Sequence, residues 1–191
     1  MSDAAQIAAG LRSLAAVAND LASHTDALDP IVSEMRKCLA SGGTLFFAGN
    51  GGSAADAQHI AAEYVVRYRR GAQPALRAIA LTTDASILTA SANDFGYEEV
   101  FARQIEALGR PGDVLIVHST SGDSANCVAA VERARALGIT TIGFLGGSGG
   151  QLAGLVDHAF VVADQQVNHV QEMHLAVQHQ IVAILSTERG G

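Results

Sequence analysis

Apolar residues recur at spacings of three and four near the start of the chain. Between Ala4 and Leu28, the repeating positions are Ile7, Leu11, Leu14, Ala18 and Leu21. This spacing places them on one face of a helix, and most residues between them are alanines. A second helical stretch begins at Pro30, a residue favoured in the first helical turn, and ends at Gly42-Gly43. The pattern therefore predicts a long N-terminal helix followed by a shorter one.

After residue 43 the pattern changes to short runs rich in β-branched and aromatic residues. Each run precedes Gly or Ser and then a segment with helical spacing. The expected strands are Thr44–Ala48, Arg77–Leu81, Asp113–Val117, Thr140–Leu145 and His158–Val162. A last helix is expected from Val167 to Ser186. Strands that alternate with helices predict an α/β fold, a five-stranded parallel sheet with helices on both faces.

The composition is apolar and acidic. The chain has 191 residues, 49% of them hydrophobic and 16% charged, with a formal net charge of −7. Soluble domains carry about 25% charged residues, so this chain has an apolar surplus. The acidic balance and the lack of any basic run argue against binding of nucleic acid or anionic membranes through bulk charge. The surplus indicates either a large core or a surface that faces another copy of the chain.

Cys38 and Cys127 belong to no metal-spaced pair and cannot form a disulfide framework. We expect both to be reduced and packed in a cytoplasmic protein. The first residues show no basic segment followed by an apolar run, and no stretch approaches 18 apolar residues, so neither a secretory signal nor a membrane span is expected.

The loops that follow the strands are candidate binding sites, because open parallel sheets bind ligands beyond the carboxyl ends of their strands. The first loop, Gly49–Ser53, leads directly into a helix. Its glycines permit close backbone approach, and a helix start presents free N–H groups to an anion. The loop matches neither the P-loop nor the dinucleotide fingerprint. A plain tight turn is the alternative interpretation.

The second loop, Ser119–Ser124, carries four hydroxyl groups in six residues at a helix start. Several hydroxyls and the positive end of the helix dipole suit the phosphate of a sugar phosphate, although an ordinary helix cap needs one hydroxyl. No Lys or Arg lies in this loop. A third loop, Gly146–Gly150, has less side-chain chemistry, and we favour a structural role for it.

Two helices carry candidate acid–base residues. His59 and Glu63 are four residues apart and share one helical face, a pair that is also common on solvated helices. The last helix carries Gln171, His174 and His179 among apolar neighbours. Gln171 and His179 are separated by a rise of roughly 12 Å and about 80° of rotation. They can share an ion only if it lies between their extended side chains, or if two copies of the helix meet. We expect His174 to have a supporting or structural role.

Four segments together resemble the sugar isomerase (SIS) family and, within it, the phosphoheptose isomerases. The matching segments are Gly49–Glu63, Ala92–Glu98, Ser119–Gly122 and Val170–His174 with His179. They occur in the family's order and spacing over nearly the whole chain. The resemblance implies an SIS-type, flavodoxin-like three-layer fold as a single domain over residues 1–191. It also implies a homotetramer in which the helices of residues 1–40 pack between subunits.

The resemblance further implies conversion of D-sedoheptulose 7-phosphate to D-glycero-D-manno-heptose 7-phosphate through a cis-enediol, in heptose biosynthesis for cell-surface polysaccharide. Glu63 and His179 would be the catalytic acid–base pair. Four residues match positions that bind zinc in family members: His59, Glu63, Gln171 and His179. The resemblance implies that they would hold one Zn²⁺ in each subunit, in a catalytic or a structural role. The positions implied to bind substrate are Asn50, Gly51, Gly52, Glu63, Asn93, Asp94, Ser119, Thr120, Ser121, Ser124 and Gln171.

Two departures from the family's pattern affect the neighbourhood of the site. Asn168-His169 stands where relatives usually have Arg or Asp-Arg, so His169 either replaces a charged contact or leaves it missing. Asp123 stands for a common Asn, and we expect it to point to solvent or to cap the helix.

Two other functions remain as alternatives. One is a non-catalytic SIS tetramer that binds the bacterial replication initiator, and the other is an isomerase of another sugar phosphate. The non-catalytic relative lacks the Glu and the last His, and because Glu63 and His179 are both present here, we favour an enzyme.

Overall fold

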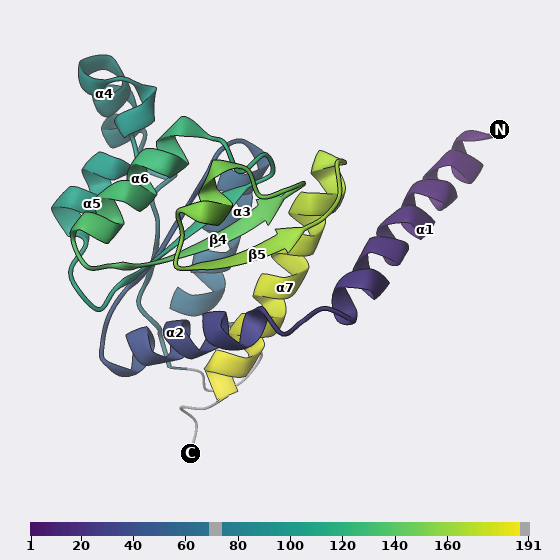
Figure 1. Cartoon of the computed structure of the whole chain (residues 1–191), viewed down its shortest axis with the longest axis horizontal. Coiled ribbons are helices and arrows are strands. Elements are labelled where there is room, and N and C mark those ends of the chain that lie inside the picture. The colour runs from purple at the N-terminus through teal and green to yellow at the C-terminus, as the bar shows by residue number, and fades with distance from the viewer. Residues whose placement is uncertain (69–73, 188–191) are drawn as a thin grey trace.

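The computed structural model describes residues 1–68 and 74–187 (Figure 1). The domain predicted over 1–191 also includes residues 69–73 and 188–191, which lie outside the described residues. The helices are α1 (Asp3–Ala22), α2 (Leu28–Ala40), α3 (Gly52–Val65), α4 (Ala85–Phe95), α5 (Ala102–Leu108), α6 (Ala125–Ala136) and α7 (Val167–Thr187). The strands are β1 (Leu45–Gly49), β2 (Ala78–Ala80), β3 (Val114–Ser119), β4 (Thr140–Gly146) and β5 (His158–Val162). Two short 3₁₀ turns are η1 (Tyr97–Glu99) and η2 (Gln151–Gly154).

The five strands form one parallel sheet in the order β2-β1-β3-β4-β5. Every residue of β1 and of β3 is buried, as expected for strands that are covered on both faces. The predicted α/β class, the five parallel strands and the long N-terminal helix are therefore confirmed.

Helices cover both faces of the sheet and divide its side chains between two cores. Alternate residues of β3 point to opposite faces: Ile116 packs in the core under α2, α3 and α7, and Leu115 packs in the core under α5 and α6. The sheet thus forms the middle of three layers, and α3 and α7 lie against each other on the same face.

The strand order reverses between β1 and β3. From β1 the chain passes to β2 on one side, and then crosses to β3 on the other side of β1. Helices α3 and α6, which follow these two central strands, lie on opposite faces of the sheet. Such a reversal opens a crevice at the carboxyl ends of the two strands, which is where open α/β sheets bind ligands.

Helix α1 ends earlier than the sequence predicts, at Ala22 rather than near Leu28. The backbone N–H of Ser23 donates to the carbonyls of Asp20 and Leu21 as the helix ends, and the His24 ring lies 2.9 Å from the Asp20 carbonyl. These local bonds take up helical carbonyls that a continued helix would use. No residue of α1 is buried, and the helix extends away from the sheet (Figure 1).

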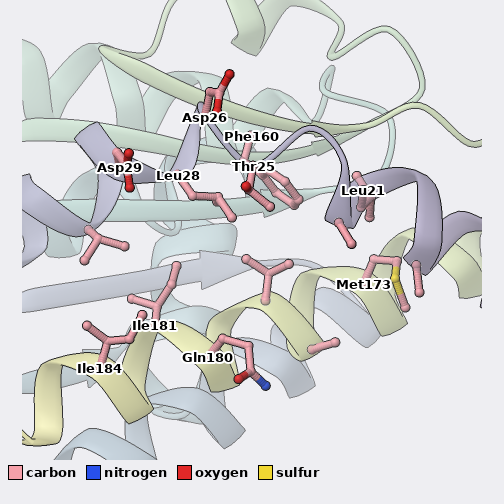
Figure 2. Close-up of a pocket in the computed structure, with 15 residues that line it drawn as sticks. Leu21, Thr25, Asp26, Leu28, Asp29, Phe160, Met173, Gln180, Ile181 and Ile184 are labelled. Carbon is pink, nitrogen blue, oxygen red and sulfur yellow. The ribbon is translucent and has the colours of Figure 1, made fainter.

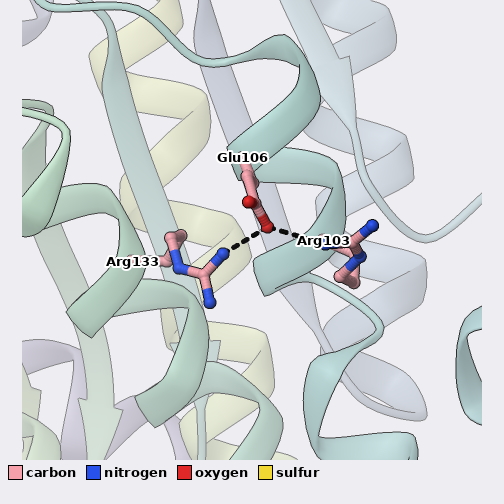
Figure 3. A network of polar contacts seen from close by, with 3 residues as sticks. All are labelled: Arg103, Glu106 and Arg133. Carbon is pink, nitrogen blue, oxygen red and sulfur yellow. Dashed lines mark hydrogen bonds and ion pairs between the residues drawn. The ribbon is translucent and has the colours of Figure 1, made fainter. Parts of the chain in front are cut away.

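Helices α5 and α6 pack side by side on their face of the sheet. Glu106 of α5 forms ion pairs with Arg103, one turn earlier, and with Arg133 of α6 (Figure 3). All three side chains are at least one third exposed, so solvent weakens these pairs and apolar packing supplies most of the contact energy.

Both cysteines are buried and free, as predicted. Burial raises the pKa of the Cys38 thiol to about 12 and that of Cys127 to about 12, so both are neutral and unreactive near pH 7. Within the described ranges, we find no helix of the length and apolar character needed to cross a membrane.

Candidate active site

Two helix N-termini meet the crevice at the carboxyl ends of β1 and β3. Helix α3 follows β1 through Gly51, whose φ of 56° lies in the left-handed region that favours glycine. Helix α6 follows β3 through Ser124. Gly51, at the N-cap of α3, has no side chain that could bond to the first turn, and the Ser124 side chain makes no such bond in α6. The first N–H groups of both helices are therefore available to an anion, with the helix dipoles adding positive potential.

Asn50 links the two loops of the crevice. Its side-chain amide exchanges two hydrogen bonds of 2.8 Å with the amide of Asn126 in α6, and Tyr97 donates its hydroxyl to Asn50 Oδ1 at 3.2 Å. Neither Asn126 nor Tyr97 was predicted to have a role in the site. Tyr97 lies inside the Ala92–Glu98 segment and Asn126 follows Ser124 by two residues, so nearness to these motifs was the available signal.

The hydroxyl loop is held in shape by its own side chains. Ser119 Oγ accepts from the Gly122 N–H at 3.1 Å and lies 3.2 Å from Ser124 Oγ. Ser121 Oγ accepts from the Asp123 N–H at 3.1 Å. Ser119 is buried, whereas Ser121 is exposed. Because these bonds are already made, the loop needs little rearrangement to receive a phosphate.

The third loop packs directly on the hydroxyl loop. A Cβ on Gly122 would lie 2.0 Å from the Gly149 carbonyl oxygen, so the two backbones touch. Asp123 accepts a hydrogen bond from the backbone N–H of Gln151 at 2.8 Å, at the start of η2. Asp123 is exposed, as one of its two expected placements has it, and it binds the start of η2 rather than capping α6. The Gly146–Gly150 loop thus has a supporting role.

His59, Glu63 and His179 form the cluster with the strongest acid–base chemistry. Nε2 of His59 lies 2.9 Å from Nε2 of His179 and 3.5 Å from a carboxylate oxygen of Glu63. One ligand atom from each of the three lies within 4.8 Å of the others. The cluster arises because α3 and α7 pack together, which the sequence spacing of the two helices does not reveal.

Partial burial shifts the pKa values of two groups in and beside this cluster, His179 and Asp56. Desolvation lowers the pKa of His179, the positive charge of His59 lowers it further, and Glu63 acts in the opposite direction. His179 is therefore largely neutral at pH 7 and able to accept a proton. Burial raises the pKa of Asp56 to about 6, opposed by His59.

Gln171 lies against the start of α3 rather than beside the other three candidate metal ligands. A Cβ on Gly52 would come within 2.6 Å of its amide, whereas His59 is about two helical turns further along α3. The extended-side-chain and two-copy arrangements given by the spacing both stay open.

Other predicted residues lie outside the cluster. Asn93 donates to the neighbouring Asp94 at 2.7 Å, and both are exposed near the end of α4. His169 is 2% exposed, and its ring lies 2.9 Å from the carboxylate of Asp164 in the same chain. His174 is fully buried, and its ring lies 3.1 Å from the Leu145 carbonyl, in agreement with a supporting role.

An apolar groove of about 430 Å³ lies away from these groups, between α1, α2 and α7. Figure 2 shows Leu21, Leu28, Met173 and Ile181 among the side chains that line it. Its lining is mostly aliphatic, which does not suit a sugar phosphate.

Comparison with known proteins places this geometry in a family. The model of the SIS domain family matches residues 11–146. The chain belongs to the SIS domain family. Its curated SIS relatives include the phosphoheptose isomerase of Paramagnetospirillum magneticum, 55% identical over 75% of this chain and 74% of the relative. That of a Roseiflexus species is 57% identical over 81% of this chain and 78% of the relative. This SIS chain therefore belongs to the phosphoheptose isomerases, which are enzymes.

Solved SIS structures show the same fold. The phosphoheptose isomerase GmhA from Neisseria gonorrhoeae superposes with a TM-score of 0.90 at 34% identity, over 97% of this chain and 100% of that one. The phosphoheptose isomerase from Francisella tularensis gives 0.87 at 32% identity, over 98% of this chain and 100% of that one.

Proposed function

We propose that the protein interconverts D-sedoheptulose 7-phosphate and D-glycero-D-manno-heptose 7-phosphate, in heptose biosynthesis for cell-surface polysaccharide. The main support for this proposal is that His59, Glu63 and His179 lie close together in a chain whose relatives are named phosphoheptose isomerases. Glu63 and His179 are also the groups that the non-catalytic SIS relative lacks, which favours an enzyme. We propose a cytoplasmic location and a single SIS domain over residues 1–191.

The phosphate would bind in the crevice at the carboxyl ends of β1 and β3, where the loops supply no cationic side chains. Donors there are the first N–H groups of α3 and α6 and the hydroxyls of Thr120, Ser121 and Ser124. Neutral donors allow a sugar phosphate to be bound and released. The remaining positions proposed to contact the substrate are Asn50, Gly51, Gly52, Glu63, Asn93, Asp94, Ser119 and Gln171.

Glu63 and His179 would carry the proton transfers. A base removes the proton from C1 of the ketose while an acid protonates the carbonyl oxygen at C2, which gives the cis-enediol. The O1 proton is then lost and a proton is returned to C2, which gives the aldose. His179, whose pKa is lowered by burial so that its ring is neutral at pH 7, can accept and return a proton, and the Glu63 carboxylate on the neighbouring helix α3 is the second proposed proton-transfer group.

The cluster also fits a zinc site. Two imidazole nitrogens and a carboxylate oxygen lie close enough to share an ion, and this donor set suits Zn²⁺. His59, Glu63 and His179, with Gln171 as the fourth proposed ligand, would hold it. When bound, Zn²⁺ would polarise the substrate carbonyl or position its oxygens. Because full ligation would occupy both proposed bases, catalytic and structural roles for the ion are both retained.

We propose that the protein is a homotetramer in which residues 1–40 pack between subunits. Helix α1 buries none of its residues in this chain, and Ile7 and Leu11 are 66% and 63% exposed. Beside it lies the apolar groove against α7 (Figure 2). An amphipathic helix with an uncovered apolar face is typical of a contact between copies.

A direct assay tests the proposal. Purified protein supplied with Zn²⁺ should convert D-sedoheptulose 7-phosphate to the aldose, and should favour it over six-carbon ketose phosphates offered at the same concentration. Absence of turnover in a sensitive coupled assay would overturn the proposed reaction. Faster turnover of a six-carbon substrate would support the alternative of another sugar-phosphate isomerase.

A further inference from the structure

A buried polar pair joins the centre of the sheet to the last helix. His118 in β3 is 1% exposed and Gln178 in α7 is 1% exposed. Nε2 of the Gln178 amide lies 3.2 Å from Nε2 of His118. An amide nitrogen only donates, so the ring nitrogen is the acceptor and His118 is the neutral tautomer protonated on Nδ1. Burial lowers the pKa of His118 to about 3, in keeping with a neutral ring.

The surroundings of this pair are apolar and aromatic. The His118 ring stacks on Phe47, with 6.3 Å between ring centroids, and lies 5.4 Å from Phe144. The His174 ring lies 6.0 Å from the His118 ring, and Gln178 Oε1 has no hydrogen-bond partner within the described part of the chain. Two polar groups that share one hydrogen bond in such a core stabilise the fold less than two apolar side chains of similar size would. Stability alone therefore does not account for the pair.

Each member of the pair precedes a residue of the proposed site. Ser119, which begins the hydroxyl loop, follows His118, and His179 follows Gln178. Both residues are already placed by geometry: Ser119 Oγ accepts from the Gly122 N–H, and His179 contacts His59 at 2.9 Å. The pair therefore connects the backbone of the loop to the backbone of the helix that carries His179.

We propose that the His118–Gln178 hydrogen bond is a positioning contact that fixes the rotation and axial placement of α7, and through them the position of His179 against His59 and Glu63. The inference rests on the proposed role of His179 in proton transfer. Most packing contacts of α7 are apolar, such as Val170, Ile181 and Val182, and apolar contacts are non-directional. One turn earlier, the buried His174 ring lies 3.1 Å from the Leu145 carbonyl of β4, whereas the His118–Gln178 bond joins α7 to β3 directly beside His179. A single buried hydrogen bond can set the register of such a helix.

A small rotation of α7 would move the His179 ring far enough to affect proton transfer. Side-chain ends lie about 5–6 Å from a helix axis, so a rotation of roughly 20° would move the His179 ring by about 2 Å. This displacement is comparable to the 2.9 Å contact with His59. A misplacement of about 1 Å can lower a rate about 100-fold. Loss of the bond should therefore act mainly on kcat, because the hydroxyl loop keeps its own internal bonds.

The test compares Gln178→Met, which keeps the length of the side chain but removes the donor, with Val182→Ala as a matched control. Val182 is fully buried one turn later in α7 and lies outside the pair. Both variants are assayed below their melting transitions. Gln178→Met should lower kcat at least about tenfold with KM changed less than about threefold, whereas Val182→Ala should keep kcat within about twofold.

Variants of the other partner complete the test. His118→Leu should reproduce the loss, and His118→Gln, which places an acceptor near the ring Nε2 position, should restore most of kcat. The double variant His118→Leu/Gln178→Met should be no slower than either single variant, because both remove the same bond.

His179→Asn distinguishes a failure of the positioning contact from a failure of the proton-transfer role proposed for His179. If it is inactive while Gln178→Met keeps native kcat, or if Val182→Ala loses as much kcat as Gln178→Met, the positioning inference is overturned. If His179→Asn is itself fully active, the proposed role of His179 fails, and the inference that rests on it fails with it.

Discussion

Gly122 sits where the hydroxyl loop touches the third loop, and replacing it with alanine tests whether this contact shapes the site. Its φ is +73°, and an added Cβ would lie 2.0 Å from the Gly149 oxygen and 2.3 Å from its carbonyl carbon. The Gly122 carbonyl also accepts the Leu152 N–H at 2.9 Å. Relief of the overlap requires the two loops to separate by an ångström or more, which breaks or stretches this bond.

Gly138 provides a matched control, because its φ is +72° and its added Cβ would meet nothing closer than Pro111 at 3.9 Å. A left-handed conformation costs a non-glycine residue about 1–2 kcal/mol, which both variants share. Gly122→Ala adds about 1–3 kcal/mol for overpacking and about 1 kcal/mol for the weakened hydrogen bond. We therefore expect it to be about 2–4 kcal/mol less stable than Gly138→Ala.

Urea unfolding followed by circular dichroism, at one protein concentration for all samples, measures this difference, and KM for the sugar phosphate measures the effect on the site. Gly122→Ala should raise KM, whereas Gly138→Ala, at the end of α6 far from the loop, should leave it near the native value. Equal stability losses in the two variants, or an unchanged KM in Gly122→Ala, would refute the role given to the loop contact.

Three further predictions concern acid stability, metal and assembly. Burial lowers the pKa of His118 to about 3 and that of His174 to about 4. Below about pH 6.5 the unfolded chain therefore binds more protons at these two histidines than the folded chain does. The free energy of unfolding should be unaffected by them above about pH 6.5, and at lower pH it should fall by up to about 1.4 kcal/mol per pH unit for each histidine. Urea titrations from pH 7.5 to 5 measure the slope, and a flat profile would contradict it. Protein purified without chelators should contain zinc by elemental analysis, and His59→Ala should lose it; equal zinc in the two would exclude His59 as a ligand. Ile7→Asp/Leu11→Asp should reduce the mass seen by light scattering without loss of helical signal, and an unchanged mass would remove the apolar face of α1 from the assembly.

The sequence predicted the fold well because its local patterns and its tertiary structure agree. The run His158–Val162 is a strand with the predicted bounds, and Arg77–Leu81 is a strand only at Ala78–Ala80. Helix α1 was predicted too long because Leu28 follows Leu21 at a helical spacing of seven residues, whereas the weak helix formers between them and the bonds at Ser23 and His24 end the helix. A helical segment was expected after the strand at 77–81, but no bounds were predicted for helices α4 and α5, since polar residues interrupt their apolar pattern.

The candidate site was predicted in part. The order of the motifs identified His59 and Glu63 on one helix and His179 on another. These three side chains lie close together only because α3 packs against α7. Spacing along a helix cannot reveal such a contact, because it fixes only which residues share a face. The His118–Gln178 bond could not be predicted for the same reason, since its partners are 60 residues apart in the sequence.

The central claim is that Glu63 and His179 transfer the proton in the isomerisation, and hydrogen exchange tests it most directly. The native protein and Glu63→Gln are incubated with D-sedoheptulose 7-phosphate in D₂O, and deuterium at C1 of the ketose is followed by NMR, with binding of the sugar phosphate measured in parallel. We expect the native protein to incorporate deuterium, and Glu63→Gln to bind the sugar phosphate without incorporating it. Incorporation by Glu63→Gln at close to the native rate would contradict the claim.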